Sequence, residues 1–367
     1  MIKLNPFTKY EFKNKVILRN KIVMAPMTTY SGNPDLTLST EEEAYYHKFS
    51  AEVGMVITAA VAVSKNAQAF PFQTSARSDF YIDSLTRLAN AIKSSGAKAI
   101  MQIHHGGRMN LPNLFIGQKI VAPSSIKALR ENLEKPIELS SNEINLVIKD
   151  FKEATIRAIK AGFDGVEIHG ANTYLVQQFY SSQSNTRTDS WGVKLKFPLR
   201  LTDEIIKTVK RNTSKPFIVG YRFSPEELEK DGITVRETVT LVKELVKRDI
   251  DYLHISLGKY DQTSLRNTAE KSITGTVILD AIRGKVPLIG VGAILDLKDL
   301  ESAFELGYDL CAIGTGLLAD CTFVSNLKTK KGPNKTIDLN MLPSGLKTRM
   351  LNAEDFYNSK GFTYQNK

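Results

Sequence analysis

The chain has 367 residues, a hydrophobic fraction of 42% and a formal net charge of +10 at pH 7. A chain of this length and composition buries a substantial core, which excludes a disordered protein, and none of its apolar runs is long enough to span a bilayer. Its two cysteines, Cys311 and Cys321, are too few for a disulfide framework or for an iron–sulfur cluster held by one chain, and their spacing does not suit a zinc site.

The first residues, Met1–Phe12, mix charged and apolar side chains and contain no apolar segment typical of a secretory signal. We therefore expect a cytoplasmic protein. The lysines are scattered, and the densest group, from Lys328 to Lys335, lacks the interleaved aromatic residues of a nucleic-acid platform. We therefore expect the positive charge to lie on a lysine-rich surface that is exposed to solvent. A weaker alternative is that this charge attracts a phosphorylated dinucleotide. The expected partners are small molecules, not nucleic acid or membrane.

About eight short apolar runs alternate with amphipathic helical stretches as far as about residue 320, which is the order that a parallel sheet of βα units requires and the number that closes a barrel. The predicted strands are Lys21–Met27, Gly54–Val61, Lys98–His104, Gly165–His169, Pro216–Arg222, Asp251–Leu257, Pro287–Gly292 and Asp309–Gly314.

The clearest helix lies between the third and fourth strands, over Asn142–Ala161, where apolar residues recur every three or four positions. Ser140 or Ser141 is the expected N-cap, with Glu143 in the first turn. Similar patterns predict helices over Val235–Arg248 and Leu297–Leu306. The residues expected to end helices in a left-handed conformation are Gly96, Gly162 and Gly307.

After Leu318 the pattern weakens. Lys328–Thr336 is expected to be a mobile basic connector, and Ile337–Lys367 a tail that either contacts another subunit or lies on the surface. The sequence therefore predicts an α/β protein with a single (β/α)8 TIM barrel over residues 1–327 and an extension over 328–367.

Polar side chains finish several of the predicted strands, where a parallel barrel carries its active site. These are Thr28, Gln102, His104, His105, His169, Asn172 and Arg222. Each could be structural when taken singly, but together they predict a pocket at one mouth of the barrel. The pairs Gly290–Gly292 and Gly314–Gly316 close the last two strands, where barrels often hold a phosphate, although glycines there also make tight turns.

Five segments, in order along the chain, resemble the motifs of the old yellow enzyme family. They are Met24–Tyr30, Gln102–Arg108, Ala122–Ser124, Ala161–Asn172 and Ser184–Asp189. The resemblance implies an FMN-dependent oxidoreductase that uses NADH or NADPH to reduce an α,β-unsaturated carbonyl or related small electrophile. The residues that it implies for FMN binding are Pro26, Met27, Thr28, Ala59, Gln102, Arg222, Gly292, Gly314 and Thr315.

The resemblance also implies the residues that act on the substrate. His169 and Asn172 match the pair that binds the substrate carbonyl, and Tyr30 matches an aromatic substrate contact. Tyr174 matches the residue that donates a proton to the α-carbon, although an aromatic cap on the rim would look the same.

Three departures from the family pattern stand out. Thr315 occupies the position of an arginine that contacts the flavin phosphate, and the stretch after Asp189 is altered. We also find no counterpart of the arginine-bearing tail with which short bacterial members reach a neighbouring subunit, because Arg349 lies in a longer, different tail. The sequence thus leaves a homo-oligomer open.

Two alternative functions keep the barrel and the flavin. A dihydrouridine-synthase-like RNA reductase agrees with the basic charge, but neither cysteine lies on a suitable mid-chain loop. A flavin-binding barrel without turnover agrees with the threonine at position 315, where the family has an arginine that contacts the flavin phosphate. The intact set of chemical residues favours the ene-reductase. No metal site is expected.

Overall fold

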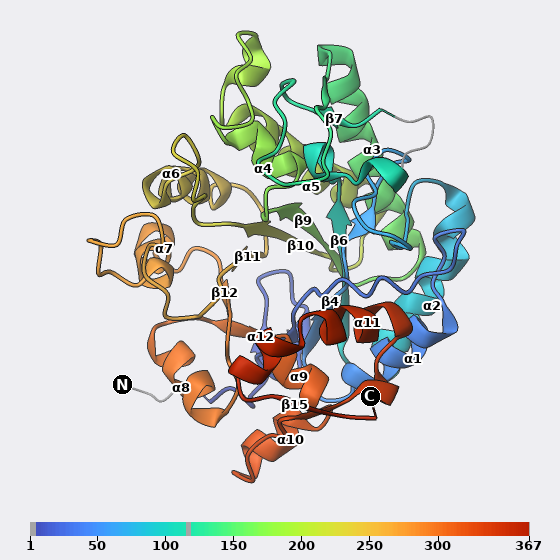
Figure 1. Cartoon of the computed structure of the whole chain (residues 1–367), viewed down its shortest axis with the longest axis vertical. Coiled ribbons are helices and arrows are strands. Elements are labelled where there is room, and N and C mark those ends of the chain that lie inside the picture. Colours follow the sequence, from blue (N-terminus) through green and yellow to red (C-terminus); the bar gives the residue numbers. More distant parts are fainter. Residues whose placement is uncertain (1–4, 115–118, 367) are drawn as a thin grey trace.

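The computed structural model describes residues 5–114 and 119–366, so residues 1–4 of the segment examined for a signal and Lys367 of the predicted tail lie outside it. Its central feature is a nine-stranded sheet that closes on itself, because β4 pairs with both β3 and β6. Figure 1 shows helices surrounding these strands. The predicted (β/α)8 barrel is confirmed.

All eight predicted strands are present, each parallel to its neighbours. The barrel strands are β3 (Ile22–Met24), β4 (Met55–Ile57), β6 (Lys98–His104), β9 (Gly165–Gly170), β10 (Ile218–Phe223), β11 (Tyr252–Ile255), β12 (Leu288–Val291) and β13 (Leu310–Ile313). The ninth, β5 (Val61–Ala62), pairs with the end of β6.

The second predicted strand is shorter than expected. Gly54–Val61 divides into β4 and β5, because the intervening backbone bonds elsewhere: the Ala59 N–H donates to the Tyr46 hydroxyl at 2.8 Å, and the Ala59 carbonyl accepts the Thr58 hydroxyl at 2.8 Å. Side chains thereby replace part of the ladder and turn the chain at the mouth of the barrel.

The helices of the barrel are α1 (Thr40–Phe49), α2 (Ile82–Lys93), α3 (Ser141–Lys160), α4 (Leu175–Tyr180), α5 (Lys196–Asn212), α6 (Val235–Leu245), α7 (Thr274–Ile282), α8 (Leu297–Glu305), α9 (Thr315–Ala319) and α10 (Phe323–Lys328). The predicted start of α3 is confirmed as a capping box between Ser140 and Glu143. Gly96, Gly162 and Gly307 have φ values of 90°, 82° and 106°, as expected for residues that end helices.

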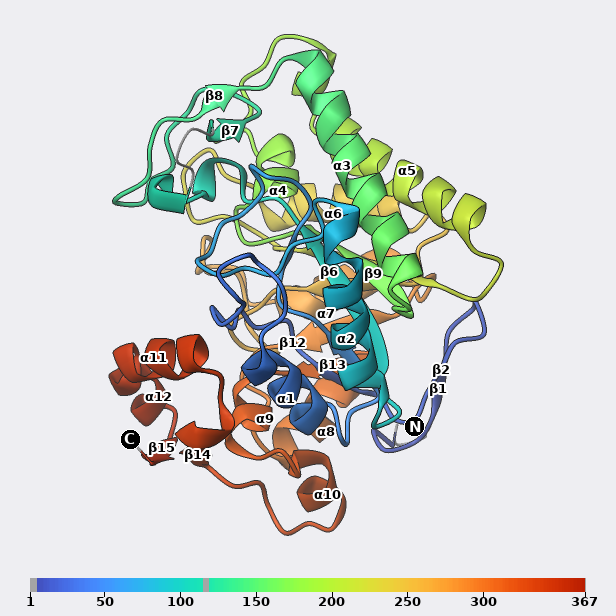
Figure 2. The same cartoon turned by 90° about the vertical axis from the view of Figure 1, so that its right-hand side faces the viewer.

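A short antiparallel hairpin, β1 (Tyr10–Glu11) and β2 (Ile17–Leu18), closes the amino-terminal end of the barrel. Phe12, Val16 and Leu18 are buried in one cluster with apolar side chains from the barrel strands. Figure 2 shows this hairpin at the opposite end of the molecule from the tail helices α11 and α12. Because these side chains fill the amino-terminal end of the barrel, we expect the functional site at the carboxyl ends of the strands.

The tail folds onto the barrel. It contains β14 (Thr336–Asp338), α11 (Ser344–Asn352), α12 (Glu354–Ser359) and β15 (Thr363–Gln365), and β14 pairs in parallel with β15. Ile337, Met350 and Phe362 are buried in the main hydrophobic core. Within the connector, the Asn334 N–H donates to Asp320 Oδ2 at 2.9 Å. The division at residue 327 stays a prediction, but both parts contribute to one core.

None of the helices in residues 5–114 and 119–366 is both long and apolar enough to cross a membrane. Cys311 is fully buried, and burial raises the pKa of its thiol.

Candidate active site at the carboxyl ends of the strands

The polar residues that finish β6, β9 and β10 lie side by side. Arg222 on β10 is in register with His169 on β9 and with His254 on β11, and Gln102 on β6 is in register with Glu167 on β9. The structure therefore brings together Gln102, His169 and Arg222, as the sequence predicts.

A buried carboxylate that the sequence analysis did not single out organises this group. Glu167 is 0% exposed and accepts hydrogen bonds from Gln102 Nε2 at 2.7 Å, the Tyr252 hydroxyl at 3.0 Å and His254 Nδ1 at 2.9 Å. Burial raises the pKa of Glu167, but His254, Arg222 and the Gln102 hydrogen bond outweigh it and hold the pKa below its usual value. A fixed negative charge thus lies beneath the mouth.

Arg222 lies next to that charge and reaches the rim. Its Nη2 donates to Ser256 Oγ at 3.1 Å, and Ser256 Oγ donates to Asn172 Oδ1 at 3.0 Å. The Asn172 backbone N–H donates to Ser224 Oγ at 2.8 Å, and Asn172 has a left-handed φ of 56°. Because its carbonyl oxygen is engaged, the exposed side chain of Asn172 is oriented as a donor of its amide N–H groups. Ser224 and Ser256 gave no signal in the sequence.

His169 is 3% exposed and lies in a cluster of rings. Its ring centroid is 5.4 Å from that of His104 and 5.2 Å from that of Tyr174, and His104 and Tyr174 are 4.5 Å apart. Burial, together with His104 and Arg222, lowers the pKa of His169 well below its usual value, and burial lowers the pKa of His104 to about 3. Both rings are therefore neutral, and His169 can act as an uncharged donor.

Tyr174 is covered by a small apolar cluster of Met109, Leu111, Ala128 and Leu133. Burial raises the pKa of Tyr174 to about 12, and Tyr30 adds to the rise while arginines at 130, 349 and 222 oppose it. The phenol keeps its proton at neutral pH. The rim thus combines a neutral histidine, an amide and a protonated phenol.

His105 has a structural role. Its Nδ1 accepts the Gly107 N–H at 3.1 Å, so the side chain fixes the turn that follows β6. The Ser184–Asp189 motif is structural as well. Arg187 is bonded to the carbonyls of Pro123 and Leu139, and it is paired with Asp189 at 2.6 Å. The altered stretch after Asp189 begins with a 3₁₀ turn that Asp189 caps.

The segment after β3 forms another side of the mouth. Pro26, Met27 and Thr28 are half-buried. A Cβ built on Gly314 would lie 3.3 Å from the Met27 sulfur, so the ends of β3 and β13 are neighbours. Half-buried Ala59 has its N–H and carbonyl bonded within the protein, as described above.

The late glycines differ in role. Gly290 and Gly316 are packing residues, because an added Cβ would meet the rings of Tyr308 and Phe323 at 2.6 Å and 2.8 Å. Gly292 has a φ of 113°, and an added Cβ would lie 2.7 Å from Leu257 O and from the Lys259 N. Gly314 caps α9, and half-buried Thr315 is the first residue of that short helix.

Lys259 was not predicted, and it follows β11 beside Gly292. Its exposed ammonium pairs with Asp261 at 2.9 Å. The Lys259 backbone lies against Gly292, a residue that the resemblance implies for FMN binding, which makes the Lys259 ammonium a candidate partner for the phosphate.

These features fit the FMN that the resemblance implies. Arg222 Nε and His169 Nδ1 are buried without a hydrogen-bond partner among the described residues, and both belong to the mouth. The backbone around Gly292 leaves no room for a side chain. The polar edge of a bound flavin would give the buried Arg222 guanidinium a partner.

Comparison with known proteins agrees with this geometry. Residues 5–334 match the model of the NADH:flavin oxidoreductase / NADH oxidase family. The chain is 42% identical to a probable NADH-dependent flavin oxidoreductase, YqiG, of Bacillus subtilis over 90% of this chain and 89% of that protein. It is 41% identical to the NADH:acrylate oxidoreductase of Vibrio harveyi and to the NADH:fumarate oxidoreductase of Klebsiella pneumoniae, but spans only 32% and 35% of their lengths.

Solved structures share the fold. The old yellow enzyme homologue of Zymomonas mobilis matches with a TM-score of 0.77 at 23% identity, over 94% of this chain and 99% of that one. Morphinone reductase in complex with tetrahydroNAD matches with a TM-score of 0.76 at 24% identity, over 90% of this chain and 92% of that one.

Proposed function

The chain belongs to the NADH:flavin oxidoreductase / NADH oxidase family, and from this premise we propose that it reduces an α,β-unsaturated carbonyl or a related small electrophile. The family makes the chain an oxidoreductase with FMN as its flavin and NADH or NADPH as its reductant. The observation that carries the proposal is the meeting of His169, Asn172 and Tyr174 at one rim, above Arg222 and Glu167.

We assign the flavin to the mouth between β3, β6, β10, β12 and β13. Pro26, Met27 and Thr28 would lie along the ring, and Gln102 and Arg222 at its polar edge. Gly292, Gly314 and Thr315 would lie around the phosphate. A bound FMN would supply the two-electron redox chemistry between the nicotinamide and the acceptor. The cation of Arg222 favours negative charge at the edge that it faces.

His169 and Asn172 bind the acceptor's carbonyl oxygen in this proposal. Burial lowers the pKa of His169, so the ring donates as a neutral group, and Ser256 leaves the Asn172 amide free to donate. Two donors at the oxygen draw electron density from the conjugated double bond and make its β-carbon more electrophilic.

Tyr174 supplies the proton. Because burial raises its pKa to about 12, the phenol is protonated at neutral pH and can donate to the α-carbon as negative charge develops there. The net reaction consumes one NADH or NADPH and one proton. It converts C=C to CH–CH, with the hydride on the β-carbon and the proton on the α-carbon.

The relatives named for acrylate and fumarate suggest unsaturated acids as acceptors. Because this chain spans about a third of each, those substrates belong to longer proteins and are candidates here, not assignments. A conjugated ketone, aldehyde or nitro group fits the two neutral donors better, since a carboxylate withdraws electrons weakly from the double bond.

The test uses the purified protein with its flavin. We expect a yellow protein whose visible absorbance is bleached anaerobically by NADH or NADPH and restored by cyclohex-2-enone. Bound flavin that is bleached but not restored by any conjugated carbonyl or nitro compound would refute the proposed acceptor class. A protein that binds FMN but is not bleached would be the flavin-binding barrel without turnover.

A further inference from the structure

The tail is held against the segment that follows β3. The Ser344 N–H donates to Glu41 Oε2 at 2.7 Å, and the Gly345 N–H donates to Ser31 Oγ at 2.8 Å. A side chain at Gly345 would place its Cβ 2.1 Å from the Tyr30 carbonyl oxygen, so only glycine allows this approach. The first turn of α11 is thus fixed beside Tyr30.

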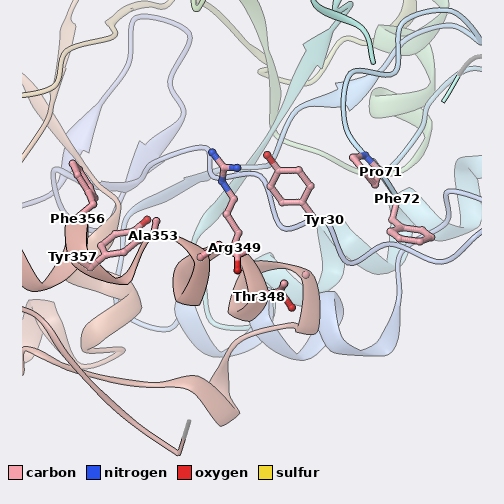
Figure 3. A pocket seen from close by; sticks show the side chains of 10 residues that line it. Tyr30, Pro71, Phe72, Thr348, Arg349, Ala353, Phe356 and Tyr357 are labelled. Atoms are coloured by element: carbon pink, nitrogen blue, oxygen red, sulfur yellow. The ribbon is translucent and has the colours of Figure 1, made fainter. Parts of the chain in front are cut away.

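This docking brings a cation to the rim from the chain's own tail. The Arg349 guanidinium lies over the Tyr30 ring, 5.2 Å from its centroid, and Figure 3 shows it rising from α11 beside that ring. The ring centroid of Tyr30 is 5.5 Å from that of Phe70, and the ring centroid of Phe70 is 5.9 Å from that of Tyr174. The ion pairs of the described residues do not include Arg349.

A cavity of about 570 Å³ opens beside Arg349 (Figure 3). Tyr30, Pro71 and Phe72 form its wall on the barrel side, and Arg349, Phe356 and Tyr357 line it from the tail. Phe72 and Phe356 are 46% and 59% exposed, so a ligand would cover apolar surface there. Because Tyr30 also belongs to the ring cluster of the proposed active site, the cavity adjoins that site.

We propose that this cavity binds a distal, carboxylate-bearing part of the electron acceptor, and that Arg349 is the residue that selects for the carboxylate. The inference rests on the proposed function and narrows its substrate class. A planar guanidinium binds a carboxylate through two parallel hydrogen bonds, and the aromatic walls suit a flat apolar linker. Arg349 is the single cation of the described lining, which matches one carboxylate better than the two charges of a dinucleotide pyrophosphate.

The test compares two acceptors of the same shape. They are 4-(3-oxobut-1-enyl)benzoate, an enone that carries a carboxylate across a phenyl ring, and its neutral methyl ester. Initial rates are measured with the NADH-reduced holoenzyme for wild type, Arg349→Met, which keeps length without charge, and Arg349→Lys, which keeps charge without the planar fork. Arg211→Met, at an exposed arginine on α5, is the matched control. Binding of the saturated product acid, 4-(3-oxobutyl)benzoate, is measured by calorimetry.

We expect wild type and Arg211→Met to prefer the acid over the ester by about tenfold in kcat/KM, the size of one charge-assisted contact. Arg349→Met should abolish the preference, so that acid and ester have equal kcat/KM, and it should weaken binding of the saturated acid about as much. Arg349→Lys should retain part of the preference.

Failure of the two proposals is distinguishable. If cyclohex-2-enone is reduced but the acid is not preferred, or if Arg349→Met keeps the preference, the carboxylate site is refuted and the proposed function stands. If Arg349→Met instead raises the KM for NADH, the arginine serves the dinucleotide and the inference is overturned. If no enone is reduced, calorimetry decides: loss of acid binding in Arg349→Met supports the anion site, and unchanged binding refutes it.

Discussion

Replacing the buried carboxylate of Glu167 by glutamine should destabilise the barrel far more than the same change on the surface. The side chain is 0% exposed and accepts hydrogen bonds from Gln102, Tyr252 and His254. Glutamine keeps the volume but replaces one acceptor oxygen by an NH₂ group, which turns a donor toward another donor. It also removes the negative charge that faces Arg222.

Removing one partner from a buried charged cluster typically costs about 3 to 5 kcal/mol, and we expect a loss of folding free energy of this size. Urea unfolding followed by circular dichroism measures it as a lower transition midpoint at unchanged slope. The control is Glu153→Gln, because Glu153 is 43% exposed and lies 3.9 Å from Arg157. That variant should stay within about 0.5 kcal/mol of wild type. A Glu167→Gln variant as stable as the control would refute the charged network.

Three further predictions follow from other buried or charged groups. In Tyr174→Phe, reduction of the acceptor should slow by about 10²- to 10⁴-fold, because this step needs the phenol's proton, while reduction of the flavin by NADH should stay within about twofold of wild type. Stopped-flow absorbance measures the two steps separately. An acceptor-reduction rate equal to that of wild type would exclude Tyr174 as the proton donor. Burial raises the pKa of Glu42 from 4.5 to about 7, so between these pH values the folded protein holds a proton that the unfolded chain releases. The stability that this proton contributes is full below about pH 4.5 and declines as the pH rises toward 7. Between pH 5 and 8, the free energy of unfolding of Glu42→Gln should therefore fall less than that of wild type, by up to about 3 kcal/mol as measured by urea unfolding. The same fall in unfolding free energy for both proteins would contradict this. Lys259→Met should raise the FMN dissociation constant about tenfold and reduce its salt dependence. Fluorescence titration measures the constant, with Lys243→Met as the control. If both variants have the same dissociation constant, Lys259 does not bind the phosphate.

The sequence revealed the barrel because strands buried on both faces form unbroken apolar runs, and β4, β12 and β13 all show this pattern. It also revealed much of the rim, because the polar residues Gln102, His169 and Arg222 lie near the carboxyl ends of β6, β9 and β10. The length of β4 was overestimated, since the Tyr46 hydroxyl takes the Ala59 N–H and no local pattern records that contact.

Residues inside the runs were missed. Glu167 and His254 are polar positions within apolar strands, and this interruption was a usable signal of a buried pair. Ser256 had no such signal, because a serine after a strand is common and only the fold sets it between Arg222 and Asn172.

The contact between the tail and the rim was beyond local sequence reasoning. Arg349 and Tyr30 are more than three hundred residues apart, and α11 has few apolar positions, with Leu346 and Met350 as its buried residues. The short parallel pair of β14 and β15 gives no alternation from which to predict it.

The central claim is that hydride and proton reach different carbons of one acceptor bound at this rim. It is tested most directly by reducing 2-methylcyclohex-2-enone anaerobically with NADH in D₂O and locating deuterium in the product by nuclear magnetic resonance. The account predicts deuterium on the α-carbon and hydrogen from NADH on the β-carbon. NADH consumption that occurs only when oxygen is admitted, with no saturated ketone formed, would contradict it.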